Sequence, residues 1–118
     1  MTWVPKRGDV VNVFAGTKNN RPGVVYRVDD RGVIVIHSVA WGTGTEPEQR
    51  RRHGDPHDPC VGVEKDSPDG RALALDKDTW FYQGERGTFE LSDLSPRPGA
   101  SACPADLLAN LIRLHRGR

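Results

Sequence analysis

The fold class follows most directly from the stretch VVYRVDDRGVIVIHS, residues 24–38. Two runs rich in Val and Ile flank the segment Asp29-Asp30-Arg31-Gly32. Because Asp and Gly accept the backbone dihedral angles of a tight turn, this stretch predicts a β-hairpin. The second run, residues 33–38, is β-branched and continuous, which is typical of a strand buried on both faces.

Further apolar segments on either side of the hairpin are short and bounded by Gly, Pro or Asp. This punctuation favours strands and turns over long helices. The segments expected to be strands or core are residues 10–14, 60–63, 72–75, 80–82 and 87–91, and Trp80 is expected in the core. Residues 67–70 predict a turn, residues 96–99 a linker, and residues 41–59 a long loop without apolar periodicity.

The last segment, residues 104–116, is predicted to be a helix. Its leucines recur at helical spacing, and Pro104 suits a first helical position, where its missing N–H is harmless. Arg113, His115 and Arg116 suit the last turn because cations there complement the helix dipole.

Length and composition predict one domain over residues 1–118, large enough to fold without a disulfide or a metal. A net charge of +1 does not suggest a general binder of duplex DNA. No apolar run is long enough to span a membrane, and Met1–Gly8 lacks the apolar core of a secretion signal. A cytoplasmic protein with no membrane partner is therefore expected, with Cys60 and Cys103 reduced.

Five segments in order resemble the MazF/PemK family of toxins. They are Gly8-Asp9-Val10-Val11, Arg21-Pro22-Gly23-Val24-Val25, residues 33–38, Asp78-Thr79-Trp80-Phe81, and residues 87–94 followed by the terminal helix. The resemblance implies a mainly β fold, a partly open SH3-like barrel with a C-terminal α-helix. It also implies a type II toxin that cleaves single-stranded RNA sequence-selectively without a metal, acts as a homodimer and is neutralised by an antitoxin.

Carried over position by position, the resemblance makes Arg21 the catalytic arginine and Ser38 the catalytic Thr or Ser. An arginine stays charged and can donate two parallel hydrogen bonds to a phosphate, and a serine can donate one more. His37 stands where the family usually has an aliphatic residue, and its ordinary pKa of about 6.5 suits a general base or acid. Since neighbours on a strand point to opposite faces, His37 and Ser38 should share a site only if the strand ends or bulges there, and the motif favours Ser38.

RNA binding would add stacking and further phosphate contacts. Trp41 is a candidate stacking platform, and Arg50, Arg51 and Arg52 could follow the RNA backbone. All four lie in the long loop, which is more charged than the family pattern suggests. Without a ligand, the three arginines would simply be a solvated loop.

The side chains of His53, His57 and Cys60, with Asp55 or Asp58, could in principle bind zinc. Their spacing matches no strong zinc motif, so no metal site and no cofactor are predicted.

Two other functions remain open. The same barrel could be a non-catalytic module that binds or inhibits a protein or nucleic-acid partner, since a fold does not determine function. It could also act on DNA gyrase, as relatives of this fold do. In either case Arg21 would be a solvated turn residue and His37 a hydrogen-bonded residue at a strand end.

Overall fold

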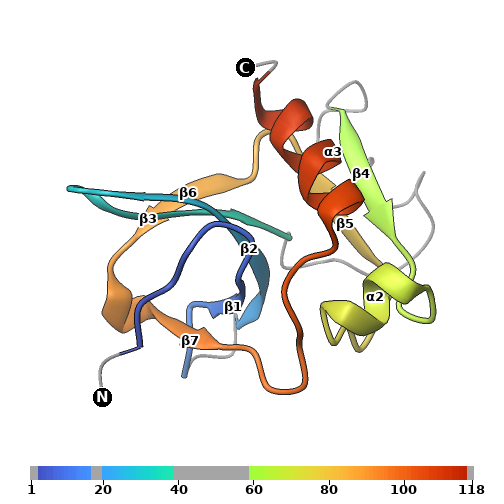
Figure 1. Cartoon of the computed structure of the whole chain (residues 1–118), viewed down its shortest axis with the longest axis horizontal. Helices are drawn as coiled ribbons and strands as arrows, with labels where there is room; N and C mark the ends of the chain where they lie inside the picture. Colours follow the sequence, from blue (N-terminus) through green and yellow to red (C-terminus); the bar gives the residue numbers. More distant parts are fainter. Residues whose placement is uncertain (1–2, 17–19, 39–58, 117–118) are drawn as a thin grey trace.

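The computed structural model describes residues 3–16, 20–38 and 59–116. These residues form seven strands, two α-helices and one 3-10 helix (Figure 1). In chain order they are β1 (Val10–Val13), β2 (Arg21–Asp29), β3 (Gly32–His37), β4 (Cys60–Val63), α2 (Pro68–Ala72), β5 (Thr79–Tyr82), β6 (Arg86–Phe89), η1 (Leu91–Asp93), β7 (Leu94–Pro96) and α3 (Ala105–Arg116). The prediction of a mainly β chain with a C-terminal helix is confirmed.

The hairpin predicted from residues 24–38 is formed by β2 and β3, with β2 beginning earlier, at Arg21. The register shifts at Tyr26, because Val25 pairs with Val35 whereas Arg27 pairs with Ile34. Such a bulge bends a strand and redirects its side chains. In β3, burial on both faces holds only for the second half, since Ile34 is half-buried.

The larger sheet is antiparallel, in the order β6-β3-β2-β1-β7, and it must be strongly curved. Its two edge strands, β6 and β7, are separated by only four residues, 90–93, three of which form η1. The chain from Phe89 to Leu94 can span about 14 Å, whereas the edges of a flat five-stranded sheet lie about 19 Å apart. The short connection therefore holds the two edges close together.

Side chains on the two faces of this sheet form two separate cores, as strand alternation requires. One face packs against α3, the two-stranded sheet of β4 and β5 and the segment around α2 (Figure 1). The fully buried residues of this core are Val24, Ile36, Leu73, Phe81 and Leu111. The opposite face, inside the curve, holds a smaller cluster made of Val11, Val13, Val25, Val33, Val35, Phe89 and Leu94. The candidate site lies at one end of this second core.

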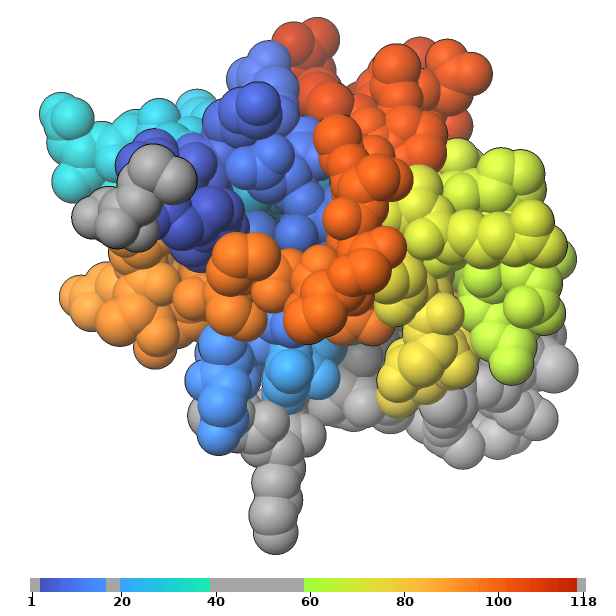
Figure 2. All heavy atoms as spheres, turned by 60° about the horizontal axis from the view of Figure 1, so that its bottom comes forward, coloured from blue at the N-terminus to red at the C-terminus, as the bar shows by residue number. Residues whose placement is uncertain are grey.

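The segment after β7 joins the sheet to the rest of the molecule. In Figure 2 it crosses in orange from the sheet toward the yellow residues that follow α2. The backbone N–H of Ser101 donates to the carbonyl of Ala72, and the backbone N–H of Cys103 donates to the carbonyl of Gly8. The residues that follow the expected linker are thus held against the rest of the structure.

Four local expectations need correction. Residues 67–70 begin a short helix rather than a turn, because the Ser67 hydroxyl accepts the Gly70 N–H and caps α2. Residues 72–75 form no strand, although Leu73 in this segment lies in the core, and Pro96 belongs to a strand, β7. Trp80 is only half-buried. Of the expected loop 41–59, residues 41–58 lie outside the described residues. No helix in the described part of the chain is long and apolar enough to cross a membrane.

Candidate active site

The hairpin brings the first residues of β2 beside the last residues of β3, because the two strands are antiparallel. Gly23 pairs with His37, and the backbone N–H of Ser38 donates to the carbonyl of Pro22 at 3.2 Å. Arg21, His37 and Ser38, which the sequence nominated from two separate segments, therefore lie together.

The backbone carbonyl of Ser38 is the point where these residues meet. Nη1 of Arg21 donates to this oxygen at 3.4 Å, and Nδ1 of His37 lies 3.0 Å from it. A carbonyl oxygen can only accept, so the hydrogen bond to His37 requires the proton on Nδ1. In the neutral ring, Nε2 then carries the lone pair that could accept a proton.

Strand alternation explains why Arg21 and His37 share a face. Arg21 and Gly23 lie two residues apart on β2, and His37 is opposite Gly23. The strand ends at His37, so Ser38 no longer follows the alternation. The structure brings the carbonyl of Ser38 to Arg21, and the residue itself is 3% exposed.

Two phenylalanines form an aromatic wall beside this group. The ring of Phe14 lies edge-to-face with that of Phe89 at 5.3 Å between centroids, and His37 lies 5.6 Å from Phe89 in the same arrangement. The guanidinium carbon of Arg21 is 5.0 Å from the centre of the Phe14 ring, within cation–π range. Phe14 has a positive φ of 54°, which non-glycine residues adopt rarely. The turn at the end of β1 thus places this ring over Arg21.

Two glycines are closely packed at the end of the core where His37 lies. A Cβ at Gly87 would lie 3.7 Å from Nε2 of His37 and 3.0 Å from the ring of Phe89. A Cβ at Gly23 would come within 2.5 Å of a Val35 methyl group. Larger residues at either position would crowd the end of the core where His37 lies.

Burial and nearby charges set the protonation of the site. Burial lowers the pKa of His37, the hydrogen bond to Ser38 and the carboxylate of Glu85 oppose this shift, and the charge of Arg21 adds to it. Below its ordinary value of 6.5, this pKa leaves the imidazole neutral at pH 7. Burial also lowers the pKa of Arg21, while Glu85 raises it, and an arginine remains charged at physiological pH. The site therefore combines a neutral imidazole with a fixed cation.

Three members of the site were missed from the sequence: Phe14, Glu85 and Phe89. The backbone of Glu85 accepts the N–H of His37 at 3.1 Å, which places this residue at the end of β3. Phe14 and Phe89 stand in apolar segments and read as ordinary core residues. No local pattern marks Glu85, whose position depends on the pairing of β3 with the chain before β6.

Several sequence candidates fall outside the described residues, namely Trp41, Arg50, Arg51, Arg52, His53 and His57. Cys60, the remaining zinc candidate, is half-buried at the start of β4 and is not in a disulfide with Cys103. Among the described residues there is no cluster of three His, Cys, Asp or Glu side chains that could hold a metal ion.

A scan against protein-family models finds no match for this chain, and a search of curated proteins finds none either.

Proposed function

We propose that this chain is a toxin of the MazF/PemK type that cleaves single-stranded RNA sequence-selectively without a metal. The curved five-stranded sheet would be its partly open SH3-like barrel, and its short β6–β7 connection supports that assignment. Its partners would be single-stranded RNA, a second copy of the chain and an antitoxin protein, and it would act in the cytoplasm.

One observation carries the proposal. A charged guanidinium and a neutral imidazole converge on the Ser38 carbonyl, from residues 16 positions apart in sequence (21 and 37). The cation can bind a phosphate, and the imidazole can accept a proton. These are two of the groups that RNA cleavage through its own 2′-hydroxyl requires.

The reaction would proceed as follows. Nε2 of His37 takes the proton of the 2′-hydroxyl, and the 2′-oxygen attacks the adjacent phosphorus. The bond from phosphorus to the 5′-oxygen breaks, and the leaving oxygen takes a proton from solvent. Arg21 stabilises the negative charge that develops on the phosphoryl oxygens, with the Ser38 hydroxyl as a second donor. The products are a 2′,3′-cyclic phosphate and a 5′-hydroxyl.

The test is incubation of the purified protein with a long mixed-sequence transcript in EDTA. Loss of one donor to the developing charge costs about 100- to 1,000-fold in rate, so Arg21→Ala should reduce cleavage to that extent. His37→Asn should reduce it by about 100- to 10,000-fold, because it removes the general base. Ser38→Ala should cost less, and Arg116→Ala, an exposed arginine on α3, is the matched control and should cleave normally.

The cleaved ends should carry 2′,3′-cyclic phosphates, and a transcript with 2′-deoxy substitutions should resist. Intact RNA after incubation with the folded wild-type protein would refute the proposal. Cleavage undiminished in both Arg21→Ala and His37→Asn would refute it as well.

A second candidate is a non-catalytic binding module on the same fold. The observation that favours it is burial, since His37 is 8% and Ser38 3% exposed. In this case the Arg21 and His37 contacts would hold the end of the sheet together, and both substitutions would lower stability without any RNA cleavage to lose.

A further inference from the structure

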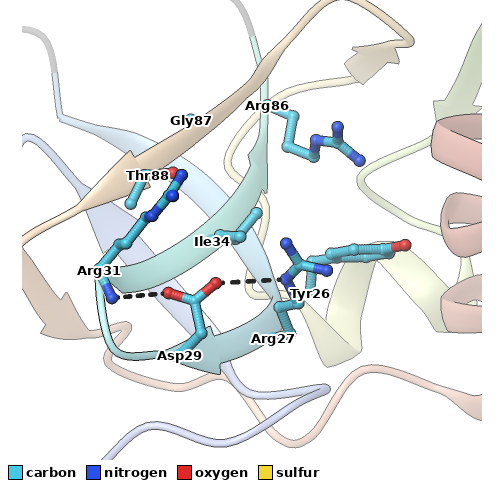
Figure 3. Close-up of a pocket in the computed structure, with 8 residues that line it drawn as sticks. All are labelled: Tyr26, Arg27, Asp29, Arg31, Ile34, Arg86, Gly87 and Thr88. Carbon is cyan, nitrogen blue, oxygen red and sulfur yellow. Dashed lines mark hydrogen bonds and ion pairs between the residues drawn. The ribbon is translucent and has the colours of Figure 1, made fainter. Parts of the chain in front are cut away.

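The other face of the sheet carries a basic groove that the proposed reaction does not use. This groove has a volume of about 340 Å³, and the side chains that matter for its chemistry are those of Tyr26, Arg27, Asp29, Arg31, Arg86 and Thr88 (Figure 3). Arg86 and Thr88 pair with Ile36 and Ile34 of β3, so they lie on the face opposite His37.

The groove has excess positive charge. Three arginines and one aspartate line it, a net of two positive charges. Within the described part of the chain, neither Arg31 nor Arg86 has a carboxylate partner. Figure 3 shows Arg27 and Arg86 beside Tyr26, and Arg31 beside Thr88, with Ile34 between the two groups.

The single carboxylate positions the arginines rather than neutralising the groove. One oxygen of Asp29 accepts the backbone N–H of Arg31 at 2.8 Å, and the other lies 3.5 Å from Nε of Arg27. Because Arg27 uses its Nε for this pair, its two terminal amino groups remain available to a ligand. Asp29 therefore fixes the turn and holds Arg27 at the groove.

Two arginines, Arg7 and Arg86, lie close to the ring of Tyr26 in this groove. The guanidinium carbon of Arg86 lies 5.5 Å and that of Arg7 5.9 Å from the centre of its ring. Nε of Arg7 also donates to the carbonyl of Tyr26 at 2.9 Å. The bulge in β2 at Tyr26 thus lies where the N-terminal segment, β2 and β6 bring their arginines together.

We propose that this groove binds backbone phosphates of single-stranded RNA, on the opposite face of the sheet from the phosphate that is cleaved. The inference rests on the proposed function, because it takes RNA as the ligand. Arginine forks and the Thr88 hydroxyl suit a tetrahedral phosphate, which offers more acceptor oxygens than a carboxylate. Glu85 belongs to the active site and Arg86 to the groove, so consecutive residues link the two sites across the edge strand β6.

The strand of RNA would pass around the start of β6, at Glu85 and Arg86, since the Phe89 ring fills the space on the inner side of Gly87. Gly87 lines the groove, and a Cβ at this position would point toward His37. RNA held on both faces of β6 would be a longer ligand than the active site alone can hold, which would contribute affinity beyond the cleaved phosphate.

The experiment measures fluorescence anisotropy of 2′-O-methyl oligonucleotides, (U)₁₀ and (A)₁₀ being convenient probes. They lack the 2′-hydroxyl nucleophile, so binding is read independently of cleavage. The test variant is Arg31→Ala/Arg86→Ala. The matched control, Arg71→Ala/Arg116→Ala, removes the same charge from exposed positions on α2 and α3.

We expect the test variant to bind at least about tenfold more weakly at 0.1 M salt, and the control to stay within about twofold of wild type. The slope of log K against log salt should shrink by about 1.4, since each phosphate contact to a single strand contributes about 0.7. Arg31→Lys/Arg86→Lys should keep the slope and lose part of the affinity, because it retains charge without the fork.

An equal loss of affinity in both double variants would overturn the proposal, because it would show only a general charge effect. So would a hepta-glutamate peptide that binds in an Arg31- and Arg86-dependent manner while the oligonucleotides do not, since the groove would then receive an acidic protein segment. If the oligonucleotides bind as expected but unmodified RNA is never cleaved, the groove is supported and the nuclease proposal is refuted.

Discussion

Among the arginines in the described part of the chain, Arg97 is the one whose loss should destabilise the fold most. It follows β7 and is half-buried. Its Nε donates to the carbonyl of Leu73 at 3.0 Å, and its Nη2 donates to the carbonyl of Ala74 at 2.8 Å. Its Nη1 donates to Oδ1 of Asn12 at 2.7 Å. One guanidinium thus joins β1, the segment after α2 and the end of β7.

The cost of Arg97→Ala can be worked out from these three acceptors. A hydrogen bond from a charged donor contributes about 1.5–3 kcal/mol when buried. This guanidinium is only half-buried, so water can reach some of the acceptors. Each hydrogen bond should therefore contribute near or below the lower limit of that range. The expected loss is about 3–4 kcal/mol, a large part of the ~5–15 kcal/mol by which such domains are stable. The melting temperature should fall by about 12–16 °C.

Urea unfolding followed by tryptophan fluorescence measures this loss. Arg97→Lys should lose about 1–2 kcal/mol, because an ammonium cannot reach three acceptors with the geometry of a fork. Arg71→Ala, at an exposed position on α2, should change stability by less than about 0.5 kcal/mol. A loss below about 1 kcal/mol in Arg97→Ala would show that the three contacts do not hold these segments together.

Two further substitutions test other parts of the structure. A Cβ at Gly62 would overlap the indole of Trp80, so Gly62→Ala should lower the free energy of unfolding by about 1–3 kcal/mol in urea titrations. In a Trp80→Leu background, where the ring is absent, the same substitution should cost little. An equal cost in both backgrounds would contradict the overlap. His37 has a folded-state pKa below its ordinary 6.5, so its neutral form contributes stability that is complete above pH 6.5 and declines as the pH falls toward the folded pKa. The wild type should therefore lose more stability than His37→Asn between pH 7 and pH 5 in parallel urea titrations, and identical pH slopes would show that the imidazole is not buried in its neutral form.

Local patterns in the sequence were sufficient for the hairpin and the terminal helix. The Asp-Asp-Arg-Gly turn between two β-branched runs and the helical spacing of the leucines in α3 both act over a few residues, and the structure confirms both elements. The short apolar segments bounded by Gly, Pro or Asp likewise predicted the mainly β character of the chain. Elements whose signals are weaker were missed: α2 depends on a single cap at Ser67, and β7 contains Pro96, which a strand tolerates at the edge of a sheet.

The sequence identified only some of the residues of the candidate site. Motif position nominated Arg21 and Ser38, and the ring chemistry of His37 made it a candidate, but strand alternation argued against pairing His37 with Ser38. Tertiary structure resolved this conflict, because β3 ends at His37 and the register places Arg21 on the same face. The contact that results uses the carbonyl of Ser38, which no side-chain motif can encode.

From the sequence alone came the strand-rich class, the hairpin, the helix and three candidate residues, since each depends on residue type and short spacing. Only the tertiary structure decided that Phe14, Glu85 and Phe89 surround His37, and that arginines from β2, the following turn and β6 share one groove. These arrangements depend on sheet order, on a bulge and on the close approach of distant strands. Because such features arise from long-range pairing and burial, no short stretch of the chain specifies them.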